Sequence, residues 1–397
     1  MAPCLLWLSA ILLSGASDFP PVPQPDVYAG DPYREDLGYR SEVEQALGLL
    51  ETDETRDSGK LALHDLLETY PKSPLLRYEW GCQQAQAGRW EKAAREWALA
   101  ADADGGRSAI SVRGLEGIAA VEAHLGHRDR ALDALVNLSR VMPLSYSVWN
   151  RLAKAADAAG QKDRAREAWE ASLALNPAQE EVARRLGRKE AAEGAPEELP
   201  KLLRRLRPSV VLVKTEAGHL TGFLAMRHGW IVTAAHGVSA GDEHVEVTRF
   251  VDGKDPVKAE GVVAFRDEQR DLALVYCAGL PAEATMCKLR SSKGLEVGER
   301  VYTIGNPGLE QEVLSLSPSE GIFSGVRKKE DEPTLLQCNM AVNRGNSGGP
   351  LFDRWGRTLG IVVAKTHLEG VMFAVDVEQL AEALSDPGGL HAPPLPK

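Results

Sequence analysis

The stretch Gly345-Asn346-Ser347-Gly348-Gly349-Pro350 decides most of what this chain can be. A serine hydroxyl is a weak nucleophile, and it attacks a carbonyl only when a base removes its proton and donors hold the oxyanion that forms. Glycines lack a Cβ, so they let the backbone turn sharply and bring its N–H groups close to a bound molecule. The full motif, followed by the apolar Leu351 and Phe352, therefore indicates a nucleophile loop rather than an ordinary turn.

A base and an acid that could serve this serine lie upstream of it. His236 ends an apolar segment that begins at Ile231, and Asp271 opens a second apolar run. Either residue alone would more often be structural or solvated. The order His, Asp, Ser is that of chymotrypsin-like enzymes and not of subtilisins or α/β-hydrolases. The three motifs together favour a triad of His236, Asp271 and Ser347.

The segment from about Pro208 to Asp386 resembles a chymotrypsin-fold serine protease and is most similar to the HtrA/Deg group. That resemblance implies an all-β double barrel and a serine endopeptidase (trypsin-like, HtrA-like) that needs no cofactor. It rests, besides the nucleophile loop, on Thr221-Gly222-Phe223, Thr233-Ala234-Ala235-His236, Asp271-Leu272-Ala273-Leu274, Val297-Gly298-Glu299, Ile304-Gly305-Asn306-Pro307 and Gly360-Ile361.

The resemblance also implies a role for each residue of the triad. Ser347 attacks the scissile carbonyl, His236 takes and returns the proton, and Asp271 orients His236. The backbone N–H groups of Gly345 and Ser347 form the oxyanion hole.

Three positions in the loop are informative about its activation. Asn346 stands where digestive proteases carry an aspartate that receives a newly cut N-terminus, so activation by such a cut is not expected. Asn339 and Arg344 replace the aspartate and proline that are usual in the family. The resting conformation of the oxyanion hole therefore stays open.

The substrate-binding residues implied by the resemblance are Val342, Val363 and Lys365. Val342 and Lys365 stand at positions that line the primary pocket in the family, and the strand around Val363 resembles the edge that pairs with an extended substrate. An aliphatic lining predicts small apolar side chains before the cut. Lys365 breaks this pattern: either its stem packs and its amine reaches solvent, or the pocket tolerates acidic residues.

The N-terminus predicts export. An apolar run, Leu5 to Leu13, precedes Ser14-Gly15-Ala16, which suits signal peptidase cleavage after Ala16. The alternative is a packed or disordered apolar start. The run is too short to be a stable membrane span. We expect a signal peptide over 1–16, a Pro-rich linker over 17–40, and a periplasmic or extracellular protein.

Residues 41–192 are rich in alanine, leucine, tryptophan and charged residues, which favours helices. They are also periodic: Gly126 and Gly160 lie 34 apart, and Gly88 lies 38 before Gly126. The pattern resembles tetratricopeptide repeats. Such an array is either a groove that binds a protein partner or a helical spacer. Residues 42–70 predict one more helical pair.

The remaining boundaries follow from composition. We expect a hinge over 193–206, the protease domain over 207–386, a Pro-rich tail over 387–397 and no PDZ domain. A net charge of −11 argues against a nucleic-acid partner. No motif indicates a metal site. Cys277 and Cys287 could pair in an exported protein or remain buried thiols.

The sequence thus predicts a helical repeat array followed by an all-β double barrel. The predicted function is an exported serine endopeptidase whose repeats recruit substrate or partner. The alternative is a repeat-based adaptor whose protease domain is weak, conditional or inactive.

Overall fold

A computed structural model describes residues 27–28, 30–104, 108–187, 195–226, 229–239, 242, 244–251, 253–281, 285–309, 312–329, 332–365 and 370–385. The predicted signal peptide, the tail and, of the predicted linker, residues 17–26 and 29 lie outside the described residues. The chain separates into two compact units, one ending at Pro143 and the other spanning Leu144–Asp386. In the described part, no helix is both long enough and apolar enough to cross a membrane.

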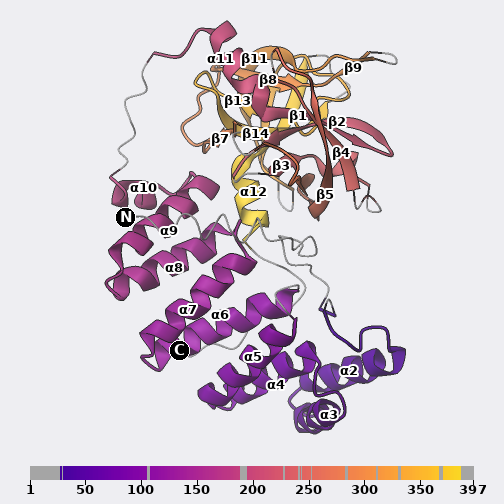
Figure 1. The fold of residues 1–397 in the computed structure, drawn as a ribbon, viewed down its shortest axis with the longest axis vertical. Helices are drawn as coiled ribbons and strands as arrows, with labels where there is room; N and C mark the ends of the chain where they lie inside the picture. Colours follow the sequence, from indigo (N-terminus) through magenta and orange to yellow (C-terminus); the bar gives the residue numbers. More distant parts are fainter. Residues whose placement is uncertain are drawn as a thin grey trace. The chain divides into compact units, whose positions relative to one another are not determined.

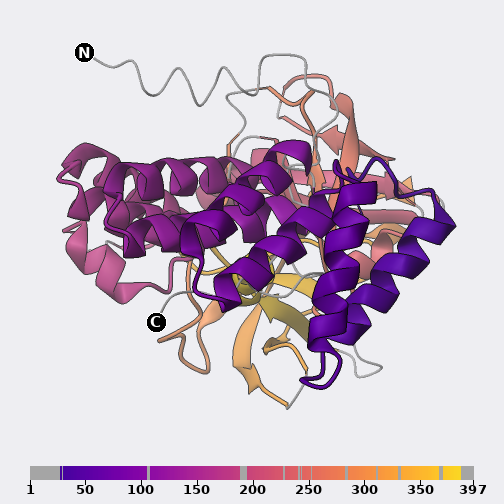
Figure 2. The same cartoon turned by 90° about the horizontal axis from the view of Figure 1, so that it is seen from below.

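The first unit is helical, and successive helices pack against one another (Figures 1 and 2). Ser73 begins one of them by accepting a hydrogen bond from the N–H of Leu76, and Pro74 suits the first turn. Gly88 and Gly126 have positive φ and end helices. The helices are α2 (Leu37–Leu50), α3 (Arg56–Thr69), α4 (Pro74–Gln86), α5 (Trp90–Asp104), α6 (Ala109–His124) and α7 (Arg128–Val141).

Trp97 belongs to the hydrophobic core of this unit and is fully buried. Its indole N–H donates to the carbonyl of Tyr78 at 3.2 Å. A Cβ added at Gly81 or at Gly117 would lie 2.6 Å from the indole ring. The two glycines thus leave the space that the ring fills between α4 and α6.

The second unit opens with α8 (Tyr146–Ala158), α9 (Lys162–Leu175) and α10 (Glu180–Arg185). The turn between α8 and α9 again uses a glycine with positive φ, Gly160. The pairs α4–α5, α6–α7 and α8–α9 fit tetratricopeptide-like repeats at the spacing of 38 and 34 residues read from their turn glycines. The helical pair expected within 42–70 is present as α2 and α3.

Part of the predicted hinge is a helix, α11 (Leu199–Leu206), followed by the turn η1 (Arg207–Ser209). Leu202 and Leu206, one turn apart, are both buried. A Cβ at Gly356, in the β-rich region, would lie 2.8 Å from Leu202. Burial of this leucine stripe explains why the segment is helical and packed rather than extended.

The first barrel is closed, with strand order β1-β2-β3-β6-β5-β4. Its interior is aliphatic, including Val211, Val213, Ile231 and Val275. A Cβ at Gly222 would lie 2.6 Å from Ile231, so the glycine suits the tight interior. The strands are β1 (Val210–Thr215), β2 (Gly218–Leu224), β3 (Trp230–Thr233), β4 (His244–Arg249), β5 (Val257–Asp267) and β6 (Leu272–Tyr276).

The second sheet has the order β13-β8-β11-β12-β15-β14-β7, and pairing of β13 with β14 closes six of its strands into a ring. A helix, α12 (Val377–Ala383), follows its last strand. The strands are β7 (Lys288–Leu289), β8 (Arg300–Gly305), β9 (Gly308–Leu309), β10 (Glu312–Val313), β11 (Ser317–Arg327), β12 (Leu335–Asn339), β13 (Pro350–Phe352), β14 (Arg357–Lys365) and β15 (Val371–Asp376). The predicted fold class, a helical array followed by a double β-barrel, is confirmed.

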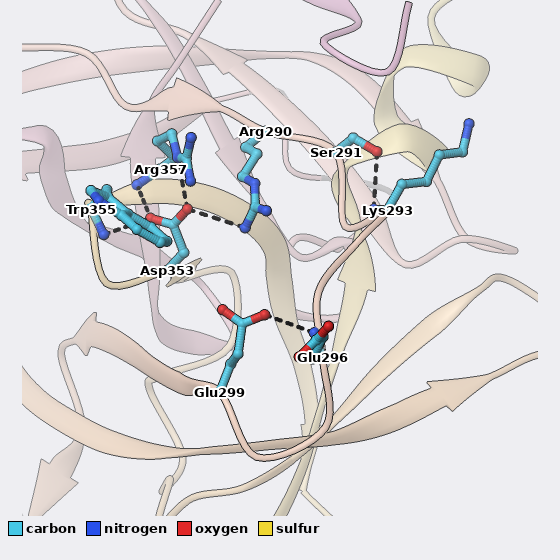
Figure 3. Close-up of polar contacts among 8 residues, drawn as sticks. All are labelled: Arg290, Ser291, Lys293, Glu296, Glu299, Asp353, Trp355 and Arg357. Atoms are coloured by element: carbon cyan, nitrogen blue, oxygen red, sulfur yellow. Dashed lines mark hydrogen bonds and ion pairs between the residues drawn. The ribbon is translucent and has the colours of Figure 1, made fainter. Parts of the chain in front are cut away.

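The turn between β13 and β14 is fixed by Asp353 (Figure 3). Its buried carboxylate accepts from the backbone N–H groups of Trp355 and Arg357, both at 2.9 Å. The guanidinium groups of Arg357 and Arg290 reach its other oxygen at 2.7 and 3.4 Å. β13 follows the nucleophile loop directly, so this cluster anchors the chain just beyond Ser347.

The cysteines of the described chain are buried thiols, and Cys277 and Cys287 are not bridged. The Cys277 thiol lies 3.3 Å from the carbonyl of Glu260, and the Cys287 thiol lies 3.2 Å from the hydroxyl of Ser209. Burial raises the pKa of the Cys287 thiol to about 11. Burial also raises the pKa of the Cys277 thiol, so neither cysteine is a reactive thiolate at neutral pH.

Candidate active site

His236 and Asp271 meet because β3 and β6 are antiparallel neighbours, with Thr233 opposite Ala273. The chain leaving β3 therefore passes the residue that enters β6. His236 lies in the short turn η2 (Ala235–Gly237). Asp271 Oδ2 lies 2.7 Å from His236 Nδ1, and Asp271 Oδ1 accepts from the His236 backbone N–H at 2.8 Å. One carboxylate thus fixes both the ring and the backbone of one histidine.

Asp271 has a φ of 56°, in the left-handed region that few non-glycine residues adopt. Aspartate is among the residues that tolerate it best. Strained backbone of this kind gathers at functional sites, where surrounding contacts maintain it. Here the two hydrogen bonds to His236 supply such contacts.

The hydrogen bond that the His236 ring donates to Asp271 raises the pKa of His236 above its ordinary value, and partial burial opposes this in part. The ring remains about half exposed. His236 can therefore take up a proton more readily than a free histidine and can still reach a bound molecule. Asp271 is also placed to stabilise the imidazolium form.

The loop that carries Ser347 lies between β12 and β13 and is held from both barrels. From the first barrel, Thr221 donates its backbone N–H to the carbonyl of Ser347 at 2.9 Å. From the second barrel, the carbonyl of Val362 in β14 accepts a hydrogen bond from the N–H of Gly348 in the loop at 2.6 Å. Gly348 has a φ of 82°, and a Cβ there would overlap the carbonyl oxygen of Thr221. The serine is consequently presented from a rigid, crowded turn.

No hydrogen bond joins His236 to Ser347 among the residues that the structure describes. Catalytic hydrogen bonds are often long or poorly aligned without substrate and tighten when it binds. The Ser347 side chain is part-exposed, as is that of His236. Both groups are thus accessible to a substrate.

The turn that precedes Ser347 has a defined peptide orientation. Asn346 donates its N–H to the carbonyl of Asn343 at 3.1 Å, and Gly345 between them has a φ of 97°. These are features of a type II turn, whose third residue has positive φ, whereas type I has negative φ there. The carbonyl of Arg344 accepts from the N–H of Gly308 at 3.0 Å. In a trans peptide the N–H of Gly345 points the opposite way.

The N–H groups of Gly345 and Ser347 donate to no acceptor within the described ranges. Their neighbours Asn346, Gly348 and Gly349 all do. These two unused donors, with one residue between them in a tight turn at the serine, form a place where an oxyanion could bind.

Sequence reasoning missed the residues that hold this turn. The buried hydroxyl of Thr221 donates to the carbonyl of Gly345 at 2.6 Å and accepts from the N–H of Asn306 at 2.9 Å. The buried amide of Asn306 donates to the carbonyl of Val211 at 3.0 Å, and its oxygen accepts from Leu316 at 3.1 Å. Both residues stand in motifs of the protease resemblance, but no local sequence pattern indicates that they hold the turn.

Asn346 is buried, and a Cβ at Gly305 would overlap its side-chain oxygen. That oxygen has no hydrogen-bond partner in the described part of the chain. The uncharged amide suits this enclosed position, where a carboxylate would need a cation.

Residues 220–361 match the family model described as a trypsin-like peptidase domain. The matched range includes His236, Asp271 and Ser347, together with the two unused N–H groups of Gly345 and Ser347. It begins in β2 and ends in β14, so it takes strands from both barrels.

Relatives of the peptidase domain are serine proteases by name. The serine protease HhoA of Synechocystis sp. is 32% identical over 169 residues, which cover 41% of this chain and 41% of that protein. An HtrA-like serine protease of Staphylococcus aureus is 30% identical over 172 residues, which cover 40% of this chain and 21% of that protein. The chain thus spans well under two thirds of either relative. The crystal structure of Deg5 is 27% identical, with a TM-score of 0.41, over 46% of this chain and 90% of that chain.

The predicted substrate residues lie on the second barrel of the peptidase domain. Val342 is part-buried and packs against the barrel core. Val363 is a buried residue of β14. The backbone of Lys365 pairs with Met372 in β15, and its side chain lies outside the described part.

Proposed function

We propose that the chain is a serine endopeptidase whose triad is Ser347, His236 and Asp271. The observation that carries the proposal is that Asp271 accepts two hydrogen bonds from His236, one from its ring and one from its backbone. A carboxylate that binds Nδ1 leaves Nε2 as the nitrogen that can face a serine hydroxyl. It also raises the pKa of His236, which strengthens this residue as a base.

The reaction follows from these positions. His236 Nε2 takes the Ser347 proton as Oγ bonds to the scissile carbonyl carbon, and the N–H groups of Gly345 and Ser347 bind the oxyanion. The imidazolium then gives its proton to the leaving amine, and an acyl-enzyme remains. Water attacks the acyl carbon in the second half, with His236 again as base, and Ser347 is regenerated.

The proposed oxyanion hole is formed at rest. The positive φ of Gly345 and the bond from Gly308 to the carbonyl of Arg344 both support this orientation. A preformed hole lowers the barrier because its dipoles need not reorganise during the reaction. Arg344, in place of the usual proline, is compatible with this turn.

We further propose that an extended substrate pairs with β14 near Val363 and that Val342 and Lys365 line the primary pocket. Small apolar side chains are then preferred before the cut. The alternative is that Lys365 lets the pocket accept acidic residues before the cut. A peptide-library cleavage profile, compared between wild type and Lys365→Ala, tests it. Acidic residues that are not enriched in wild type, with a profile unchanged in the variant, would exclude a specificity role for Lys365.

The helical array is proposed to recruit protein substrates or a partner, and the protein to be exported. Three helical pairs, α2–α3, α4–α5 and α6–α7, lie in one compact unit, which supports a structured binding surface. Covalent crosslinking of Ser347→Ala in its native setting, followed by mass spectrometry, identifies trapped proteins. A mature N-terminus at Ser17 would support export, and retention of Met1 would argue against it.

Fluorophosphonate labelling tests the enzymatic proposal directly. The wild type should be labelled at Ser347 and should cleave unfolded protein, while Ser347→Ala should do neither. Labelling without turnover would favour the alternative, an adaptor with a weak or conditional protease domain. No labelling of the folded wild type would exclude the proposed triad.

A further inference from the structure

His219 is a second histidine close to the nucleophile loop, and neither the triad nor the oxyanion hole uses it. It lies in β2, opposite Lys214 of β1, and is part-buried. Its Nε2 lies 3.1 Å from the carbonyl oxygen of Asn306. A carbonyl oxygen only accepts, so Nε2 carries the hydrogen and donates it.

The imidazole also lies against the two glycines that set the turn. A Cβ at Gly345 would lie 2.8 Å from His219 Nε2, and a Cβ at Gly308 would lie 3.1 Å from His219 Cε1. The same added Cβ at Gly345 would overlap the carbonyl oxygen of Asn306. The hydrogen bond from His219 to Asn306 is therefore formed directly beside the α-carbon of Gly345.

The hydrogen bond from His219 to Asn306 is linked through the chain to the peptide between Arg344 and Gly345, which supplies one donor of the oxyanion hole. Asn306 is followed by Pro307 and Gly308, and Gly308 donates to the carbonyl of Arg344. That bond sets the orientation of the peptide whose N–H belongs to Gly345. A shift of the segment from Asn306 to Gly308 would release the carbonyl of Arg344 and let the peptide rotate.

Loss of the imidazole would also leave the carbonyl of Asn306 without its donor. An enclosed carbonyl without a partner competes for any free N–H nearby. The N–H of Gly345 makes no bond within the described ranges, and its α-carbon lies against this oxygen. Capture of that N–H by Asn306 would remove one oxyanion donor.

We propose that His219 is a positioning residue for the oxyanion hole: it holds the carbonyl of Asn306 and thereby keeps the N–H of Gly345 directed at the substrate. This inference rests on the proposed endopeptidase function. His219 touches none of the reacting atoms in it. Its effect is on the transition state, because the donor it maintains binds charge that develops only there.

The test compares His219→Ala with His219→Gln in the full-length protein. Gln keeps an amide N–H that can donate to Asn306, and Ala does not. The control is His244→Ala, because His244 is an exposed histidine of β4 whose ring pairs with Glu260 at 2.5 Å. The measurements are kcat and KM on one fluorogenic peptide, the inhibition constant of a peptide boronate of the same sequence, and the melting temperature.

For His219→Ala we expect kcat to fall about 10- to 100-fold, as for a misplaced or lost oxyanion donor, while KM changes less than about twofold. Affinity for the boronate should fall by the same factor, since its oxygen occupies the hole. His219→Gln should recover most of the loss, and His244→Ala should match wild type. If His219→Ala unfolds, we use His219→Leu in its place, because leucine fills much of the space of the imidazole but has no hydrogen-bond donor.

Three results would overturn the positioning role while the wild type remains active. They are an unchanged kcat in the variant without a donor, a loss confined to KM, and a Gln variant as slow as the Ala variant. A wild type that neither cleaves nor reacts with fluorophosphonate would instead overturn the proposed function, and the positioning role with it.

Discussion

Both carboxylate oxygens of Asp271 bind His236, one at the ring nitrogen Nδ1 and the other at the backbone N–H. The pair therefore sets the tautomer, the ring orientation and the position of the turn that carries the histidine. Removal of the charge while the shape is kept should affect the chemistry far more than the fold.

Asp271→Asn tests this relationship through the pH profile. The hydrogen bond to Asp271 raises the pKa of His236, so wild-type kcat/KM should increase with pH, and the midpoint of the increase should lie above the ordinary pKa of histidine. The variant should show a lower midpoint and a rate reduced on the order of 10⁴-fold, because the tautomer is no longer fixed. Glu260→Gln, which alters the surface pair with His244, should leave both unchanged.

The same pair predicts how stability depends on pH. A histidine whose pKa is raised by folding stabilises the folded state fully below its unfolded pKa, and this contribution is lost as pH rises through the folded pKa. The difference in free energy of unfolding between wild type and Asp271→Asn should therefore be larger at pH 5 than at pH 9. A difference that grows toward pH 9 would contradict this sign.

Thr221→Val tests the hydroxyl that joins the two barrels. The change keeps the shape but leaves the buried carbonyl of Gly345 without the 2.6 Å bond and the N–H of Asn306 without an acceptor. We expect unfolding to become easier by about 2–4 kcal/mol, since two buried groups lose partners. Chemical denaturation measures the loss, and kcat should fall as well because Gly345 carries an oxyanion donor.

Thr248→Val is the matched control for this change. Thr248 is a buried threonine of β4 in the same barrel, and its hydroxyl has no partner in the described chain. The substitution should be neutral or stabilising by up to about 1 kcal/mol, because no hydrogen bond is lost. Equal losses in Thr221→Val and Thr248→Val would show that the Thr221 contacts do not matter.

The contrast between His236 and Thr221 explains what could be predicted from the sequence. His236, Asp271 and Ser347 stand in short motifs whose chain order is informative by itself, and the alternation of apolar residues predicts barrel strands. Thr221 acts through Gly345, 124 residues away, and Asn306 acts through Val211, 95 residues away. Such bonds depend on how the two barrels meet, which local periodicity does not specify.

The helix α11 was missed for a different reason. It has eight residues, it follows a segment with Gly194 and Pro196, and Pro200 lies in its first turn, a composition that favours a hinge. The spacing of Leu202 and Leu206 was the signal for an amphipathic helix, but a single turn of spacing is weak evidence. Packing against the second barrel is what decides it.

Gly348→Ala tests the crowding beneath the nucleophile. The residue has positive φ, and a Cβ would overlap the carbonyl of Thr221 and the hydroxyl of Thr233. Gly298→Ala is the control, because Gly298 also has positive φ but has open space around its Cβ position. We expect Gly298→Ala to cost about 1–2 kcal/mol, from the backbone alone, and Gly348→Ala to cost more than about 4 kcal/mol. Comparable melting temperatures would contradict the clash.

Gly81→Ala and Gly117→Ala test the packing around Trp97 in the helical unit. Each added methyl would lie 2.6 Å from the buried indole, from opposite helices. Each change should destabilise by about 1–3 kcal/mol through overpacking, although alanine is the better helix former. Gly48→Ala, on an exposed turn of α2 with open space, should stabilise by about 0.5–1 kcal/mol instead. Denaturant unfolding measures the change in free energy of unfolding for each variant. A decrease for Gly81→Ala and Gly117→Ala with an increase for Gly48→Ala would establish that Trp97 requires the two buried glycines. An increase for all three variants would show that the indole can move aside.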